Sequence, residues 1–139
     1  MVTDAHGDNP AHDMPLVHYL PDDRVVRAGI EMLQAVEKLR PYFETVYGMS
    51  FRIGIGVHYG DVVLGTIGAP NAARTTAIGD AVNFASRIES ANKLIGTSFL
   101  ISEQIYDQVG DRIVAKRHDD VAIPGRSTQC ALYEVVSIP

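Results

Sequence analysis

An amide and a guanidinium stand four residues apart in the middle of the chain, at Asn83 and Arg87. The apolar residues around them recur at three- and four-residue steps, which is typical of a helix, so the two side chains share one face, about one turn apart. A neutral donor and a forked cation so placed can together hold an anion. The alternative is a solvated helix face on which Arg87 pairs with Asp80 or Glu89. The spacing alone leaves both interpretations open.

Another cation, Arg126, follows Gly125 in a predicted turn between two strands, where glycine allows the bend and the arginine points outward. By itself it is typical of an ordinary surface charge. Five glycines upstream resemble a phosphate loop at first sight, but they match neither the dinucleotide fingerprint nor the P-loop. Glycines inside strands more often mark the close approach of a neighbouring segment. These glycines are residues 54, 56, 60, 65 and 68.

Two helices are predicted beside these residues. The first begins near Asp22, where two acids follow a proline; we expect Pro41 to end or kink it and Gly48 to stop whatever continues. The second runs from Asp80 to about Leu94, and its periodicity places Asn83 and Arg87 opposite its buried side. The residues predicted to be buried on the second helix are Ala81, Phe84, Ala85, Ile88, Ala91 and Leu94.

Strands are predicted on either side of the second helix. Residues 51–58 alternate strictly between apolar and polar or glycine residues, and residues 62–67 follow after a tight connection, which predicts a hairpin. A short strand over 98–101 precedes a helix over 102–109, for which Ser102 is a plausible N-cap. Strands over 113–115, 121–123 and 130–136 complete the chain. Helices and strands mix without regular alternation, so the fold class is α+β.

The composition bounds the class of protein. The 139 residues suffice for one ordinary domain, and a net charge of −5 argues against a nucleic-acid-binding face. No apolar stretch reaches the length of a membrane span, and a single cysteine fits a reducing compartment, so we expect a cytoplasmic protein. Residues 1–21 are polar and interrupted by prolines, so they are expected to be a leader or linker to a domain over residues 22–139.

Four segments, taken in order, resemble the class III nucleotidyl cyclase catalytic domain. They are FRIGIGVHYGDVVLGTIG at 51–68, TAIGDAVNFASRIE at 76–89, IS at 101–102 and PGRS at 124–127. The resemblance extends from about residue 22 to residue 136, and the joint occurrence of the segments is far more specific than any one of them. It implies a ferredoxin-like α+β domain with a mainly antiparallel sheet and flanking helices. It also implies that a nucleoside triphosphate is cyclised to a 3′,5′-cyclic nucleotide and pyrophosphate, in intracellular signalling.

The resemblance assigns roles to four residues. Asn83 is similar to the asparagine that orients the ribose, and Arg87 to the arginine that stabilises charge on the transferring phosphate. Arg126 falls where the family places a basic residue, usually lysine, against the terminal phosphates. Thr76, seven residues before Asn83, stands at a base-contacting position that is often Asp or Thr in adenylyl cyclases. The resemblance therefore favours ATP over GTP.

One departure concerns the metal. The family uses two divalent ions, Mg²⁺ or Mn²⁺, held by two aspartates in a Phe-Ala-Asp-Ile-like strand and a Gly-Asp-containing hairpin. Neither motif is found in this sequence, and Asp4, Asp8 and Asp13 lie in the wrong surroundings to replace them. We therefore expect this chain to contain the C-terminal portion of the domain without its metal ligands, and to be inactive by itself.

Assembly is the remaining expectation from the resemblance. Family active sites form between two catalytic domains, so we expect a homodimer or pairing with another cyclase domain. The alternatives are a non-catalytic regulatory module that pairs with a complete cyclase, and a plain ferredoxin-like interaction domain with no nucleotide affinity.

Overall fold

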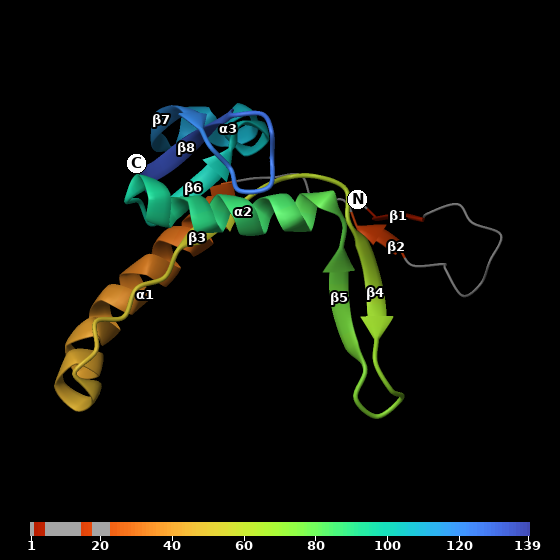
Figure 1. Ribbon diagram of the computed structural model, residues 1–139, viewed down its shortest axis with the longest axis horizontal. Helices are drawn as coiled ribbons and strands as arrows, with labels where there is room; N and C mark the ends of the chain where they lie inside the picture. Colours follow the sequence, from red (N-terminus) through yellow and green to blue (C-terminus); the bar gives the residue numbers. More distant parts are fainter. Residues whose placement is uncertain (1, 5–14, 18–22) are drawn as a thin grey trace.

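A four-stranded sheet is the largest sheet of the computed structural model, which describes residues 2–4, 15–17 and 23–139 (Figure 1). Its strand order is β3-β6-β8-β7, with β3 (Ile55–Val57) parallel to β6 (Phe99–Ser102) and the other neighbours antiparallel. The two remaining strands of this sheet are β7 (Val114–Val121) and β8 (Cys130–Ser137). A mainly antiparallel α+β fold is therefore confirmed.

Helices cover both faces of this sheet. Successive side chains of a strand point to opposite faces, so neighbouring residues of β6 contact different helices. Phe99 and Ile101 of β6 lie in one buried cluster with residues from α1 (Asp23–Tyr47) and α3 (Glu103–Val109). Leu100, between them, lies in a second cluster with Phe84 and Ile88 of α2 (Asp80–Ile95). The alternation in β6 thus fixes α2 on the face opposite α1 and α3.

Glycine lets α2 lie very close to β3. A side chain at Gly56 would overlap the backbone of Ala85 and Glu89 in α2. The buried Asn92 reinforces this packing, because its amide donates hydrogen bonds of 3.0 Å to the carbonyl oxygens of Ile55 and Glu89. The packing interpretation of this glycine is confirmed. The predicted burial of α2 holds at Phe84, Ile88 and Ala91 but is wrong at Leu94, which is 68% exposed.

Helix α1 is longer than the sheet that it covers. Its first turns are buried at Val26 and Gly29, whereas its far half extends beyond the sheet and exposes Tyr42 and Tyr47 (Figure 1). The sequence predicts that Pro41 ends or kinks this helix and that Gly48 stops whatever continues; the helix does not end at Pro41 but continues to Tyr47, immediately before Gly48. A proline in a helix removes one backbone hydrogen bond, and flanking turns can compensate for that loss.

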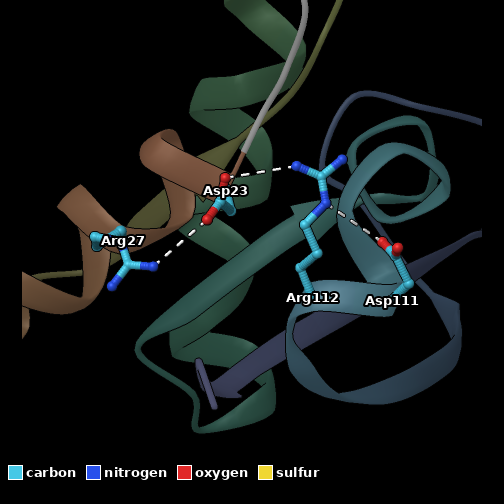
Figure 2. A network of polar contacts seen from close by, with 4 residues as sticks. All are labelled: Asp23, Arg27, Asp111 and Arg112. Carbon is cyan, nitrogen blue, oxygen red and sulfur yellow. Dashed lines mark hydrogen bonds and ion pairs between the residues drawn. The ribbon is translucent and has the colours of Figure 1, made fainter.

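Charged side chains connect the start of α1 to the turn after α3, the 3-10 element η1 (Gly110–Arg112). The carboxylate of Asp23 forms an ion pair with the guanidinium of Arg112, at an N–O distance of 3.5 Å. It forms a second ion pair, at 3.4 Å, with Arg27, one helical turn later (Figure 2). Arg112 also lies 3.6 Å from Asp111. These pairs are partly exposed, so each contributes little to stability, but together they orient the first turn of α1.

The predicted hairpin between residues 51–58 and 62–67 is wrong. Strand β4 (Val63–Ile67) pairs antiparallel with β5 (Arg74–Ile78), and the two form an arm that projects away from the central sheet (Figure 1). Strand β5 is not among the strands predicted from the sequence. Thr75 and Thr76 favour an extended conformation because they are β-branched, which is the signal that could have identified β5.

Two further differences concern short strands. The predicted strands over 113–115 and 121–123 are one strand, β7, which is irregular between His118 and Val121, where Asp120 has a φ of 55°. Within the segment expected to be a leader, β1 (Val2–Asp4) pairs antiparallel with β2 (Pro15–Val17), which the sequence does not predict. The rest of that segment lies outside the described residues.

Candidate functional site

Helix α2 and the turn between β7 and β8 carry three of the four predicted site residues. Asn83 and Arg87 lie in the first two turns of α2, and Arg126 lies in the turn. The helix begins immediately after β5, with Gly79 at a φ of 145° between them. Only glycine adopts this backbone conformation at little cost, so Gly79 permits the sharp entry from the arm into α2. The fourth residue, Thr76, lies on β5.

The turn between β7 and β8 rests on Arg87. The backbone N–H of Arg126 donates a 3.1 Å hydrogen bond to the carbonyl oxygen of Ile123, which closes the turn. Gly125 within it has a φ of 79°, and a Cβ atom there would lie 3.2 Å from the guanidinium carbon of Arg87. Glycine is therefore required both by the bend and by the close approach of Arg87.

The side chain of Arg126 lies over the ring of Phe84, which is three residues before Arg87 on α2. The guanidinium carbon is 4.1 Å from the ring centre, a cation–π contact. Residues three apart on a helix are neighbours, so the turn brings its own arginine to the same face as Arg87. The sequence predicts that Arg87 lies on the side of α2 opposite Phe84. In the structure one turn contacts both residues, since Gly125 packs against Arg87 and Arg126 packs over Phe84.

Neither Arg87 nor Arg126 forms an ion pair within residues 23–139, so the pairing of Arg87 with Asp80 or Glu89 does not form there. Gly125 lies against the guanidinium of Arg87, and the next residue, Arg126, places its own guanidinium over Phe84, three residues before Arg87 on α2. Cations without a paired carboxylate attract an anion. This arrangement is the chemical core of the candidate site.

His58 lies behind Phe84 and is the residue of this cluster that the sequence analysis does not identify. Its ring meets the ring of Phe84 edge to face, with 4.6 Å between the centres, and its Nδ1 lies 3.0 Å from the buried Ser102 Oγ. Burial, and then the charge of Arg126, lower the pKa of His58 below its ordinary value. The ring is therefore neutral at pH 7 and adds no third cation to the site.

Asn83 and Thr76 are near the beginning of α2 but are not joined to the arginine pair. Asn83 is exposed, and its backbone N–H donates a 3.3 Å hydrogen bond to the carbonyl oxygen of Gly79. Thr76 is half-buried and lies opposite Gly65 of β4. Over the described ranges, no hydrogen bond connects either side chain to Arg87 or Arg126.

The described residues do not fit a divalent metal. In residues 2–4, 15–17 and 23–139, no three His, Cys, Asp or Glu side chains lie close enough together to hold an ion. Asp8 and Asp13 lie outside those ranges. Arg87 and Arg126 are donors only, and Asn83 supplies a single neutral oxygen, whereas Mg²⁺ prefers carboxylate and phosphate oxygens. Among the described residues, the site therefore offers two cationic side chains and no carboxylate cluster for a metal.

A comparison with known protein families identifies the family of this chain. The profile described as "Adenylate and Guanylate cyclase catalytic domain" matches residues 21–135, which include the arginine pair, Asn83 and Thr76. The chain belongs to this family. None of the helices in the described ranges is long and apolar enough to cross a membrane.

Known cyclases are similar to this chain in sequence and in structure. An adenylate cyclase from Anabaena cylindrica is 34% identical over 123 residues, which cover 81% of this chain and 24% of that protein. The adenylyl cyclase CyaB from P. aeruginosa is 30% identical with a TM-score of 0.69, covering 82% of this chain and 58% of that one. The guanylate cyclase domain of RhGC from Catenaria anguillulae, solved in complex with GTP, is 28% identical with a TM-score of 0.68, covering 84% and 60%. The cyclase chain thus spans less than two thirds of each of these proteins.

Proposed function

We propose that residues 22–139 supply one half of an adenylate cyclase active site, which forms 3′,5′-cyclic AMP and pyrophosphate from ATP. The observation that carries this proposal is the turn between β7 and β8, which packs Gly125 against the guanidinium of Arg87 and places Arg126 over Phe84 of α2, while neither arginine forms an ion pair in the described part of the chain. A triphosphate is the anion in this family's reaction that needs two such cations.

Each of the four residues has a separate task in this proposal. In the reaction, the ribose 3′-oxygen forms a bond to the α-phosphorus while the bond from that phosphorus to the leaving pyrophosphate breaks. Arg87 donates hydrogen bonds to the phosphoryl oxygens as their charge develops, and preorganised donors of this kind contribute about 100- to 1000-fold in rate. Arg126 binds the terminal phosphates, and Asn83 donates to the ribose and fixes the direction of attack.

The choice of ATP rests on Thr76. A threonine hydroxyl both donates and accepts hydrogen bonds, so it can meet the Watson–Crick edge of adenine from β5. The Anabaena relative is an adenylate cyclase, whereas one of the similar structures binds GTP. A competition assay with ATP and GTP on the assembled enzyme tests this choice: Thr76→Ala lowers the ratio of ATP to GTP turnover if the threonine reads the base.

The metal and its ligands come from a partner in this proposal. Mg²⁺ or Mn²⁺, when bound, activates the 3′-hydroxyl and neutralises the triphosphate. A homodimer of this chain pairs two sites of the same kind, so a cyclase domain that carries the two aspartates is the productive partner. The protein then works in the cytoplasm, where its nucleotide substrate is abundant.

A mixing experiment tests the proposed half-site. The chain is combined with a cyclase domain that keeps both aspartates but lacks its own asparagine and arginine, and cyclic AMP is measured with Mg²⁺ and with Mn²⁺. We expect product from the mixture and none from either component. The same mixture with Arg87→Ala in this chain is the matched control. Product from this chain alone, or equal product with Arg87→Ala, contradicts the proposal.

A non-catalytic regulatory module is the second candidate, favoured by the lack of a metal-ligand cluster in the described residues. Such a module would change the activity of an intact cyclase on mixing but would not rescue the one that lacks asparagine and arginine. The same experiment therefore separates the two candidates.

A further inference from the structure

The guanidinium of Arg126 is held by an aromatic ring rather than by a polar partner. Arg126 is exposed, and across residues 23–139 no hydrogen bond or ion pair reaches its guanidinium. Its contact is with Phe84, whose ring centre is 4.1 Å from the guanidinium carbon. An arginine on a surface turn otherwise samples many rotamers, so this contact is what selects its direction.

The ring of Phe84 is itself fixed from behind. It is only 6% exposed and belongs to the buried cluster of α2, β6 and β8. The ring of His58 meets it at an interplanar angle of 80°, and Ser102, 1% exposed, holds His58 through the 3.0 Å contact between Oγ and Nδ1. The core of the domain thus determines where the ring presents its face.

We propose that Phe84 is a positioning residue, which holds Arg126 beside Arg87 so that both guanidiniums face the same polyphosphate before it binds. This inference rests on the proposed function of the arginine pair. A cation that is already oriented loses less conformational freedom on binding, so the ring increases affinity without touching the ligand. His58 acts one step further back, by fixing the ring.

The magnitude follows from the strength of the contact. Cation–π contacts at exposed sites change an equilibrium by about two- to five-fold. We therefore expect Phe84→Leu to weaken binding of inorganic tripolyphosphate two- to five-fold, because leucine fills most of the buried volume but has no π face. Phe84→Tyr keeps the face and is expected to bind like the parent chain. Thermal unfolding of each variant reports separately on the packing.

A double-mutant cycle distinguishes positioning from a general structural effect. Tripolyphosphate binding is measured by calorimetry for the parent, Phe84→Leu, Arg126→Gln and the double variant. If the ring acts through the arginine, Phe84→Leu has no further effect once Arg126 is glutamine. If Phe84→Leu weakens binding equally in both backgrounds, the positioning role is wrong.

A ligand-free measurement tests the geometry alone. Protons held over an aromatic face resonate upfield, so the Nε–H signal of Arg126, assigned through Arg126→Lys, should be upfield in the parent and in Phe84→Tyr but not in Phe84→Leu. A parent signal without this shift overturns the proposal. If the shift is present but the parent binds no tripolyphosphate, the proposed anion site fails, and the purpose assigned to the contact fails with it.

Discussion

Gly125→Ala is the sharpest perturbation of the site, because it acts on Arg87 without changing any charge. Two effects follow from the geometry. Alanine at a φ of 79° is strained by about 1 to 2 kcal/mol relative to glycine. Its Cβ would also lie 3.2 Å from the guanidinium carbon of Arg87, which is tighter than an ordinary van der Waals contact, so the guanidinium must shift by a few tenths of an ångström.

The chain offers a matched control in Gly96→Ala. Gly96, at the end of α2, has a φ of 80°, but a Cβ there meets nothing within 4 Å. The two substitutions therefore share the backbone strain and differ in the contact with Arg87. At an unfolding entropy of about 2.1 cal/mol/K per residue, 1 kcal/mol corresponds to about 3 °C for a chain of 139 residues. We expect both variants to lose about 3 to 7 °C in Tm.

Only the binding measurement should separate the two variants. A charge-assisted hydrogen bond contributes about 1.5 to 3 kcal/mol. Losing about 1 kcal/mol of this through misplacement of Arg87 weakens binding about five-fold. Calorimetric titration with tripolyphosphate should show this loss for Gly125→Ala and parent-like affinity for Gly96→Ala. Equal affinities of the two variants would refute the placement of Arg87 against the turn.

Three further predictions follow from the site and the fold. In the assembled enzyme, Arg87→Ala should cut turnover about 100-fold or more with little change in substrate affinity, and Asn83→Ala should behave similarly; steady-state kinetics that show unchanged turnover would contradict these roles. The folded chain binds a proton at His58 less readily than the unfolded chain, because the pKa of His58 is lowered; the stability of the parent relative to His58→Gln should therefore fall as the pH drops below about 6.5, measured by thermal unfolding at pH 7.5 and 5.0. Strand β3 is at the end of its sheet and the β4–β5 arm exposes Val63 and Ile67, so light scattering at tens of micromolar should show dimers or larger species, and a monodisperse monomer would count against this.

The elements with strong local signals could be predicted from the sequence. The second helix is such a case: its apolar period, the glycines around it and the acid at Asp80 all agree, and the structure places it at Asp80–Ile95. Its clear error, Leu94, occurs in the last turn, where the next residue, Ile95, packs against the buried cluster instead. Residues three and four positions after Ala91 both suit the period of a helix, so the period does not say which of the two is buried.

The pairing of the strands could not be predicted in the same way. Strand β3 pairs with β6, more than forty residues later, while β4 pairs with the next strand in the chain. The tight connection at residues 59–61 is the local signal that favours a hairpin. Gly56 has the packing role that the sequence predicts, but the segment that approaches it, α2, is determined by the tertiary packing. A glycine inside a strand predicts that another segment approaches closely, but it does not identify that segment.

The candidate site illustrates the same limit more strongly. Arg126 lies 39 residues after Arg87 in the sequence, and each alone is typical of a surface charge. In the proposed site, the turn between β7 and β8 packs against α2, where Gly125 leaves room for the guanidinium of Arg87 and Phe84 supports that of Arg126. Phe84 is read from the periodicity as a core residue, and it is one, since only 6% of it is exposed. A buried aromatic side chain therefore has two tasks here: one side of its ring completes the core, and the face that remains accessible determines where a cation stands. Periodicity and burial identify an aromatic residue that completes the core, but not one that also positions a cation. Such a residue is found from the polar side chains that contact the accessible face of its ring.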